Sequence, residues 1–422
     1  MEYNHLASKQ ASKQASKQAS KQASKQASKQ ASKQASKQEL LFLSRTLGRA
    51  GVGVSLVALL KNIDYSCFNV TLGIEYPVKE LETEIPDKVK IIYYGEISSR
   101  LYRKIFDFNK KLGKQKQNPI KRFFWHCLNK LENLRMIYQV KKNFNKKYDT
   151  VNAYHQGVAS RYAIKYIHAK KKILWYHASI IEYAWYKKIF SRANIIVANS
   201  ENVRKMLLGE WGNKFSKKIE VIECFISVDE IIKKSLMPIQ IDLGKRFKII
   251  TCGRLSPEKG MDLAIEAAKY IKDITDDFIW LIIGDGKQKK LLEEKICNLD
   301  LNKNVKLVGY FENPYPIFKM CDIYVAPSRL ESYGLTIVEA LVFAKPVVTT
   351  KTDGGLTNII NEYNGLYADF DSKSIAENVI RLMTDNKLLG KIRKNISNIN
   401  FKTLQEKKIS CLNEMQCCKK GG

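Results

Sequence analysis

The sequence predicts an α/β protein made of two consecutive domains, each built around a parallel sheet. The chain has 422 residues, more than one ordinary hydrophobic core requires. Short apolar runs of strand length alternate with helical patterns along most of it. Glycine-containing loops follow several of these runs, as they do at the opening of a βαβ unit.

The first domain is predicted at residues 39–236, after a low-complexity tail at 1–38. It opens with a buried parallel strand at Glu39–Ser44, the glycine loop Gly48–Gly53 and a helix from Val54 to Ile63. Further strands are expected at 70–76, 89–94, 150–154, 172–176, 195–199 and 219–223. Helical stretches are expected between them.

The second domain is predicted at residues 237–395, after a linker near 235–244. Its strands are expected at 247–253, 278–284, 305–307, 323–326, 346–350 and 365–367, and its helices at 261–271, 287–298, 336–343 and 374–383. The remaining segment, 396–422, is expected to be helical and polar. Two such domains place a ligand between them, at the carboxyl ends of the strands.

Residues 7–38 are eight perfect copies of Ala-Ser-Lys-Gln. The repeat has no apolar face, so we expect disorder or a lone helix. Its codons can spell the tetranucleotide GCAA throughout, which predicts a slippable tract that shifts the reading frame and switches expression. In this it resembles phase-variable genes for surface glycans of Gram-negative bacteria. A neutral repeat expansion is the alternative.

The positive charge is concentrated in two places. The net charge is +30; eight lysines lie in the repeat, and residues 100–147 hold fifteen Lys and Arg against Asp107 and Glu132. A basic segment interleaved with aromatic residues can bind anionic lipid or nucleic acid, or can be a solvated helical face. No nucleic-acid motif accompanies the charge, so no nucleic acid is expected as a partner.

Composition also excludes several classes of protein. No run of about 18 apolar residues occurs, and the N-terminus is polar, so neither a transmembrane helix nor a secretory signal is expected. The nine cysteines show no paired CxxC spacing. This indicates reduced thiols in a cytosol, without a disulfide framework or zinc site. We expect a cytoplasmic protein, peripheral on the inner face of the cytoplasmic membrane.

The strongest chemical signal is a pair of glutamates, Glu331 and Glu339, separated by seven residues. They follow the predicted strand at 323–326 and run into a helix. This places Gly334, Leu335 and Thr336 at the helix N-terminus, where backbone N–H groups and the helix dipole can bind a phosphate.

A basic glycine loop follows the first strand of the second domain. Gly253, Arg254 and Lys259 lie on it, and the two cations can neutralise a diphosphate, the arginine as a bidentate fork and the lysine as a point charge. A departing nucleoside diphosphate gains charge in the transition state, so these cations would lower the barrier as well as bind.

With these motifs the second domain resembles the donor domain of the retaining glycosyltransferases of family four, which have the GT-B fold. The matching strings are Gly-Arg-Leu-Ser-Pro-Glu-Lys-Gly (253–260), Ile-Gly-Asp-Gly (283–286), Ala-Pro-Ser-Arg-Leu-Glu-Ser-Tyr-Gly (326–334), Glu-Ala (339–340), Pro-Val-Val (346–348), Gly-Gly (354–355) and Asn-Gly (364–365). The resemblance implies two Rossmann-like domains that face each other across a cleft.

The resemblance also implies roles for single residues. Arg254 and Lys259 would bind the donor diphosphate, and Glu331 the donor sugar. Glu339 would bind the ribose. The backbone near Gly309 and Tyr310 would contact the base of the donor nucleotide. The family favours uridine as the nucleoside.

The first domain matches the family less closely. Its loop with Gly51 and Gly53 sits where the family closes over the donor phosphates. His177, at the end of a predicted strand, looks like the family's histidine near the donor sugar, and His155 is a second strand-end candidate. The chain has Cys224-Phe-Ile-Ser-Val-Asp229 where the family often has Pro-Asn-Gly-Val-Asp.

The resemblance implies a hexosyltransferase that moves a sugar from a nucleotide sugar, with retention of anomeric configuration. The acceptor is expected to be lipooligosaccharide or another lipid-linked surface glycan. No cofactor or metal is expected, and the pair Asp369 and Asp371 is interpreted as a loop. Two alternatives stay open: a basic protein that binds nucleic acid or anionic lipid, and a catalytically inactive carbohydrate-binding scaffold.

Overall fold

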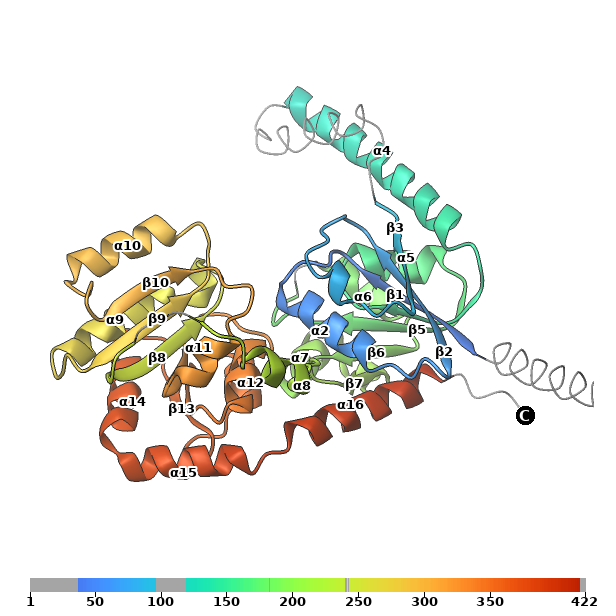
Figure 1. The fold of residues 1–422 in the computed structure, drawn as a ribbon. Coiled ribbons are helices and arrows are strands. Elements are labelled where there is room, and N and C mark those ends of the chain that lie inside the picture. The colour runs from blue at the N-terminus through green and yellow to red at the C-terminus, as the bar shows by residue number, and fades with distance from the viewer. Residues whose placement is uncertain (1–36, 96–118, 182, 240, 242, 418–422) are drawn as a thin grey trace, which may run out of the picture.

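The computed structural model describes residues 37–95, 119–181, 183–239, 241 and 243–417. The repeats up to residue 36 and residues 96–118 of the basic segment lie outside the described residues. Two separate parallel sheets stand beside each other, as Figure 1 shows. The predicted fold class, α/β with two Rossmann-like domains, is confirmed.

The first sheet has seven parallel strands in the order β3-β2-β1-β4-β5-β6-β7. They are β1 (Gln38–Ser44), β2 (Phe68–Ile74), β3 (Val89–Tyr93), β4 (Tyr148–Ala153), β5 (Ala169–Tyr176), β6 (Ile195–Ala198) and β7 (Ile219–Val221). The described helices between them are α2 (Gly51–Lys61), α4 (Pro119–Asn143), α5 (Val158–Tyr166), α6 (Trp185–Phe190) and α7 (Glu201–Trp211), and α8 (Val228–Lys234) follows β7. All seven strands were predicted, within two or three residues at each end.

Alternate side chains of the first sheet build two hydrophobic layers, because successive side chains of a strand point to opposite faces. Leu41 and Leu43 pack on one face against residues of α4, α5, α6 and α7. Leu40 and Phe42 pack on the other face against α2. A doubly covered parallel sheet explains why its strands read as continuous apolar runs.

The second sheet has six parallel strands in the order β10-β9-β8-β11-β12-β13. They are β8 (Phe247–Cys252), β9 (Phe278–Ile283), β10 (Val305–Gly309), β11 (Ile323–Ala326), β12 (Val347–Thr350) and β13 (Gly365–Ala368). The helices are α9 (Met261–Lys272), α10 (Lys289–Asn298), α11 (Tyr315–Met320), α12 (Leu335–Val342), α13 (Asp353–Asn358), α14 (Ser372–Thr384) and α15 (Asn386–Ser397).

Both sheets reverse their strand order at the first strand of the domain. β1 lies between β2 and β4, and β8 lies between β9 and β11. Ligands of doubly wound sheets bind at the carboxyl ends of strands where the order reverses. The predicted loop Gly48–Gly53 is helical from Gly51, where α2 begins three residues earlier than expected. This segment between β1 and α2, and the loop Gly253–Gly260 after β8, are therefore best placed to face a ligand.

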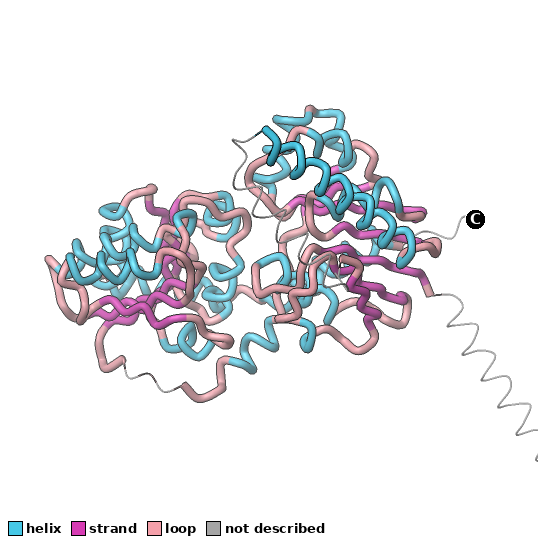
Figure 2. The backbone as a smooth tube through the Cα atoms, turned by 90° about the horizontal axis from the view of Figure 1, so that it is seen from above, coloured by secondary structure: helices cyan, strands magenta, loops and turns pink. Residues whose placement is uncertain are grey.

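The last helix, α16 (Phe401–Gln416), returns from the second domain to the first (Figure 1). Leu412 is fully buried in the first-domain layer that also holds Phe42. The Thr150 hydroxyl on β4 donates a hydrogen bond to the Gln416 carbonyl, at 2.9 Å. The sequence left the position of this helix open; in the structure it fastens the chain end to the first domain. Figure 2 shows the two domains from above.

The domains touch through a small apolar cluster. Cys224, Ile226 and Ile231, from the end of the first domain and α8, pack with Tyr333 and Val338 of the second. The cluster sits next to the loop that carries Glu331 and Gly334.

Candidate active site in the interdomain cleft

A cavity of about 1000 Å³ lies between the two domains. Its first-domain lining includes Gly51, Gly53, His155, His177 and Asn199. Its second-domain lining includes Gly253, Arg254, Lys259, Tyr310, Glu331, Gly334, Leu335 and Thr336. Twelve of these thirteen residues were predicted as site or candidate residues from the sequence. Asn199 was not assigned a role.

The cationic loop follows β8 at the reversal of the second sheet. Lys259 ends a single turn of 3-10 helix, and Gly260 behind it has φ of +64°, a left-handed conformation that favours glycine. A Cβ at Gly260 would also lie 2.0 Å from the Pro327 carbonyl oxygen. The glycine lets the turn pack against the end of β11 and holds Lys259 over the cleft.

Lys259 forms an ion pair with Glu331 in the cleft. Its Nζ lies 2.5 Å from Oε2 of Glu331, and both side chains are mostly shielded from solvent. The cation that was predicted to bind the diphosphate and the carboxylate that was predicted to contact the sugar thus lie in direct contact. A bound diphosphate would compete with Glu331 for this lysine.

The loop from Glu331 to Gly334 packs against the start of α13. The Gly354 amide donates to the Glu331 carbonyl at 2.8 Å, and a Cβ at Gly354 would lie 2.7 Å from both Glu331 Cγ and the Tyr333 carbonyl carbon. A side chain at this position would push the loop away. The absence of a side chain at Gly354 therefore determines where Glu331 lies in the cleft.

Helix α12 points its N-terminus into the cleft. Gly334 is its N-cap, with φ of +79°, and Leu335 and Thr336 form the first turn and line the cavity. No side chain caps this end, so the first backbone N–H groups face the cavity beside Lys259 and Arg254. The N-terminal dipole and two cations make the second-domain wall an anion-binding surface.

Glu339 lies on α12 but not on the wall of the large cavity. It lines a neighbouring cavity of about 70 Å³, and its Oε1 accepts a hydrogen bond from the Tyr315 hydroxyl at 3.1 Å. Burial raises the pKa of Glu339 to about 7, and the Tyr315 hydrogen bond only partly offsets this. Gly309 also lies off the cavity wall, whereas its neighbour Tyr310 is on it and exposed.

The first-domain wall carries two histidines held neutral by burial. Burial, with a smaller contribution from the neighbouring His155, lowers the pKa of His177 to about 3. Burial lowers the pKa of His155 to about 4, helped by the nearby Arg45. Each histidine follows a strand, β5 and β4 respectively, at the carboxyl edge of the sheet. Both can donate or accept hydrogen bonds without carrying charge.

Two buried polar atoms on this wall have no hydrogen-bond partner among the described residues. They are Nε2 of His177 and Oδ1 of Asn199. Asn199 follows β6 and its Nδ2 reaches the His177 carbonyl at 3.5 Å. Buried polar groups in proteins are almost always bonded, so these two suit a polar ligand in the cleft. The position of Asn199 directly after an apolar strand is the sequence signal that could have identified it.

The glycine loop of the first domain comes close to the anion-binding wall. A Cβ at Gly51 would lie 3.3 Å from Leu335 Cδ1 across the cleft. A Cβ at Gly53, in the first turn of α2, would lie 2.2 Å from the Gly48 carbonyl oxygen, so a glycine here lets the preceding turn pack against the helix. Arg49 on this loop forms an ion pair with Glu312 of the second domain, at 2.5 Å. This contact between the domains was not predicted.

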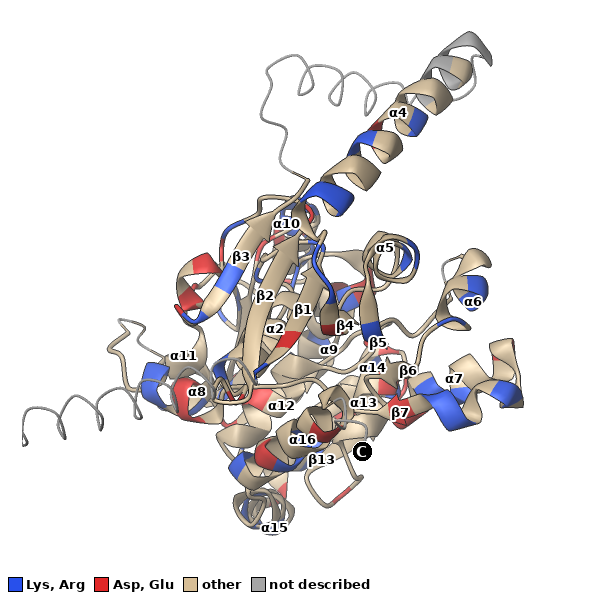
Figure 3. Ribbon diagram, turned by 90° about the vertical axis from the view of Figure 1, so that its right-hand side faces the viewer, with Lys and Arg blue, Asp and Glu red and all other residues tan. Residues whose placement is uncertain are grey.

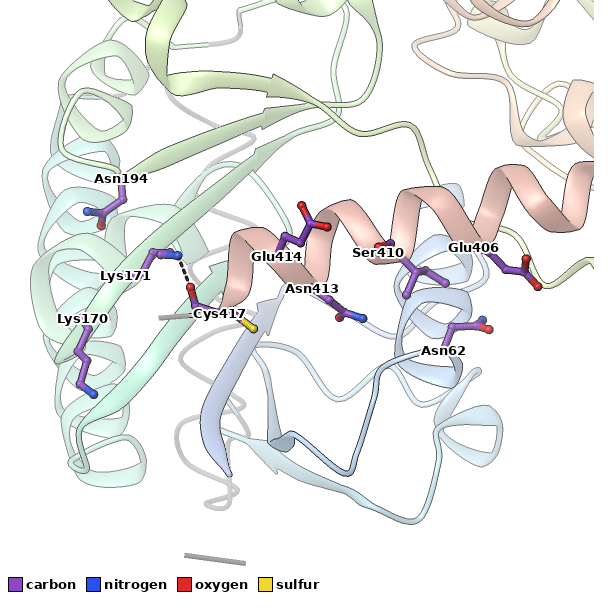
Figure 4. A pocket seen from close by; sticks show the side chains of 10 residues that line it. Asn62, Lys170, Lys171, Asn194, Glu406, Ser410, Asn413, Glu414 and Cys417 are labelled. Atoms are coloured by element: carbon purple, nitrogen blue, oxygen red, sulfur yellow. Dashed lines mark hydrogen bonds between the residues drawn. The ribbon is translucent and has the colours of Figure 1, made fainter. Parts of the chain in front are cut away.

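A second hollow, of about 1210 Å³, lies under α16 and away from these residues (Figure 4). Lys171 donates there to the Cys417 and Met415 carbonyls, at 2.8 and 2.7 Å. Lys170 pairs with Asp149 at 2.7 Å. Lys171 caps the carboxyl end of α16, where a cation is favoured, so we explain this lysine by helix stability.

Among the described residues, no group of three or more His, Cys, Asp or Glu side chains is placed to hold a metal ion. The part of the chain that the structure describes also has no helix long and apolar enough to cross a membrane.

Comparison with known proteins gives consistent similarities. Residues 234–399 match the family described as glycosyl transferases group 1. An uncharacterised glycosyltransferase of Methanocaldococcus jannaschii is 32% identical over 158 residues, which are 37% of this chain and 43% of that protein. The N-acetylgalactosamine-N,N'-diacetylbacillosaminyl-diphospho-undecaprenol 4-alpha-N-acetylgalactosaminyltransferase of Campylobacter jejuni is 26% identical over 223 residues, 53% of this chain and 59% of that protein. The chain spans about half the length of the curated relatives it matches.

The similarity to solved structures extends over both domains. The crystal structure of HepE from Anabaena in complex with UDP-glucose superposes with a TM-score of 0.67 at 18% identity, and it covers 89% of this chain and 100% of that one. At this identity the likeness concerns the fold, which is the GT-B arrangement of two facing sheets. Residues 234–399 are thus similar to glycosyl transferases group 1, and the two domains together form the GT-B fold.

Proposed function

We propose that this protein is a glycosyltransferase that transfers a hexosyl unit from a UDP-sugar to a lipid-linked glycan acceptor. The carrying observation is the convergence of Arg254, Lys259 and the N-terminus of α12 on one side of the interdomain cleft. Two cations and a row of backbone N–H groups suit a diphosphate. The UDP-glucose complex of HepE, which shares this fold, supports a uridine nucleotide donor.

The reaction we propose keeps the anomeric configuration. The acceptor hydroxyl attacks the anomeric carbon on the face from which the diphosphate leaves, and its proton passes to the departing phosphate oxygen. The bond from carbon to that oxygen breaks as the new glycosidic bond forms. Arg254, Lys259 and the α12 amides stabilise the charge that develops on the diphosphate. With these groups supplying the charge, the proposal requires no metal or other cofactor.

The remaining residues take supporting roles in this proposal. Glu331 contacts the donor sugar once a diphosphate has drawn Lys259 away. His177, neutral and with an unpartnered Nε2, bonds a hydroxyl of the sugar or its acceptor. Glu339 takes the ribose hydroxyls, which requires exchange of its hydrogen bond from Tyr315. Tyr310 lies beside the base.

The acceptor is assigned from three lines of support. The Campylobacter relative acts on a diphospho-undecaprenol-linked sugar by its name. The first domain carries the basic segment 100–147. The tetrapeptide repeat fits a gene that varies a surface glycan. We therefore place the acceptor among lipooligosaccharide or related surface glycans, built at the cytoplasmic face of the inner membrane, and we assign the repeat to expression switching.

A thermal-shift screen tests the donor assignment. UDP, GDP, ADP and CMP, and sugars linked to them, are added to the full chain and to an Arg254→Ala, Lys259→Ala double variant. A ligand that binds only the folded protein raises its melting temperature. We expect stabilisation by the uridine nucleotides that is lost in the double variant. If no nucleotide stabilises the wild type at millimolar concentration, the donor site is wrong.

A further inference from the structure

Helix α4 carries an apolar line on its outer side. Leu131, Leu134 and Tyr138 are 59%, 55% and 63% exposed, and Cys127 one turn before them is exposed as well. The spacing of four, three and four residues places all of them on one face of a helix. Four exposed residues of this kind in one line are unusual on a water-facing helix.

The opposite side of α4 accounts for its attachment to the domain. Met136 and Val140 are buried in the first-domain core, and Phe144 follows them just after the helix. In projection these residues lie opposite the exposed line. The helix thus has one apolar side for its own protein and another that does not face the core.

The apolar line is bordered by cations. Lys130 and Lys142, both exposed, fall on either side of it in helical projection. The helix sequence carries six Lys or Arg and one acid, Glu132, which pairs with Arg135 at 2.6 Å. Figure 3 shows α4 standing out from the domain with its basic residues along it.

Helix α4 lies at the same edge of the first sheet as the cleft. Arg135 donates to the carbonyl of Gly95, just past β3, at 3.3 Å, so this turn lies level with the carboxyl edge of the sheet. The residues of α4 before it, 119–134, extend about 24 Å further at 1.5 Å per residue. Figure 1 shows this part projecting beyond the domain. The same carboxyl edge carries His155 and His177.

We infer that the outer face of α4, defined by Cys127, Leu131, Leu134 and Tyr138 with Lys130 and Lys142 beside it, binds the surface of an anionic lipid bilayer. Apolar side chains enter the boundary between headgroups and acyl chains while the lysines stay at the headgroups. A second copy of the chain is the weaker occupant, because a symmetric contact would set these lysines against those of the partner. The face lies outside the cleft, so its failure and the failure of the donor site can be told apart.

A fluorophore sensitive to polarity tests contact directly. It is attached at Cys127 in a full chain in which the other exposed cysteines and Cys418 are replaced by serine. A matched chain carries the label at Cys297, which is exposed on α10 in the second domain. With vesicles of phosphatidylethanolamine and phosphatidylglycerol, emission should brighten and shift to the blue at Cys127 and stay constant at Cys297.

Substitution tests the energetics. A triple variant with Leu131→Ser, Leu134→Ser and Tyr138→Ser should partition onto these vesicles about 100-fold more weakly. The reason is that three large apolar side chains are no longer available to be buried in the bilayer. The matched control is Tyr270→Ser, Ile274→Ser and Leu291→Ser, three exposed apolar residues of the second domain. Both variants should keep the thermal shift with UDP, which shows that they fold and bind donor. Vesicles of phosphatidylcholine should bind the wild type at least about tenfold more weakly.

Two results would overturn the inference. Equal vesicle binding by the two triple variants would show that the α4 face is not the contact. A spectral change at Cys127 that grows with protein concentration and needs no vesicles would show that a second copy covers the face.

Discussion

Lys259 Nζ lies 2.5 Å from a carboxylate oxygen of Glu331, so the two residues with the clearest predicted roles neutralise each other in the cleft. The contact joins the loop after β8 to the loop before α12. In the proposed function, a diphosphate that binds Lys259 would replace one anionic partner by another and release the carboxylate toward the sugar. Donor binding and readiness for reaction would then be linked through one ion pair.

We expect substitutions of this pair to have opposite effects on donor binding. Lys259→Gln should weaken UDP binding by about 10- to 100-fold, the size of a lost charge-assisted hydrogen bond. Glu331→Gln should leave UDP binding unchanged or make it severalfold tighter, because a competitor for the lysine is gone, while it lowers the turnover of a UDP-sugar. Calorimetry with UDP and initial rates measure the two effects.

Lys269→Gln is the matched control, since Lys269 is a lysine of the same domain that pairs with Asp273 outside the cleft. It should bind UDP as the wild type does. Equal weakening of UDP binding by Lys259→Gln and Glu331→Gln would show that the pair acts as a structural unit, and the competition between carboxylate and diphosphate would be wrong.

The sequence predicted the strands well because each is a buried parallel strand that stands out as an apolar run, such as Phe278–Ile283. It also brought Arg254, Lys259, Glu331 and the α12 N-terminus to one site, because each follows a strand and carboxyl ends meet at one edge of a parallel sheet.

Contacts between the two domains could not be predicted from the sequence. The ion pair of Arg49 with Glu312 joins residues 263 positions apart, and no local pattern marks either of them. The course of α16 was equally hidden, because Leu412 alone does not reveal which core receives it. The location of Glu339 beside Tyr315, off the main cavity wall, depends on which way α12 turns, and that is decided by tertiary packing.

His177 should stay neutral throughout the physiological pH range. Its pKa is lowered to about 3 by burial, so the imidazole takes up no proton between pH 5 and 8. Nitrogen chemical shifts of the ring, assigned by comparison with His177→Gln, should be constant over this range. A titration of His177 near pH 6.5 would contradict its burial.

The same variant probes the role of the unpartnered Nε2. His177→Gln should lower turnover by about 10- to 100-fold, the cost of one lost hydrogen bond to a bound substrate. Its effect on UDP binding should be small, because the proposed function assigns the histidine to the sugar or its acceptor and not to the diphosphate. An equal loss of UDP affinity would assign His177 to the nucleotide instead.

Glu339 should make the protein less stable as pH rises. The pKa of Glu339 in the folded protein, about 7, lies above the ordinary value of 4.5. Its contribution to stability is therefore fully present below pH 4.5 and is lost as pH rises through 7. The loss amounts to about 3 kcal/mol when integrated over that shift. Glu75, whose pKa burial also raises to about 7, adds a similar dependence to the wild type.

Calorimetric melting of Glu339→Gln measures how much Glu339 contributes to the pH dependence of stability. The melting temperature of this variant should fall less between pH 5 and pH 8 than that of the wild type. Glu220→Gln, an exposed change on β7, should keep the wild-type dependence. Parallel curves for Glu339→Gln and the wild type would mean that Glu339 is ionised in the folded protein at pH 5.

Gly334 is the residue whose conformation aims the α12 N-terminus at the cleft. Its φ is +79°, and a Cβ there would lie 2.8 Å from Ile337 Cδ1. Gly334→Ala should therefore cost about 1–2 kcal/mol of stability and, by turning the first amides of α12, weaken UDP binding.

The matched control is Gly209→Ala within α7, where an added Cβ meets nothing within 4 Å. It should stabilise the chain by about 0.5–1 kcal/mol, because alanine loses less conformational entropy in a helix than glycine does. Melting temperatures and UDP titrations of both variants measure the effects. Weaker UDP binding in Gly334→Ala with normal binding in Gly209→Ala assigns the phosphate contact to α12. Normal UDP binding in a folded Gly334→Ala variant would remove the helix N-terminus from the donor site and leave the cationic loop after β8 to hold the diphosphate.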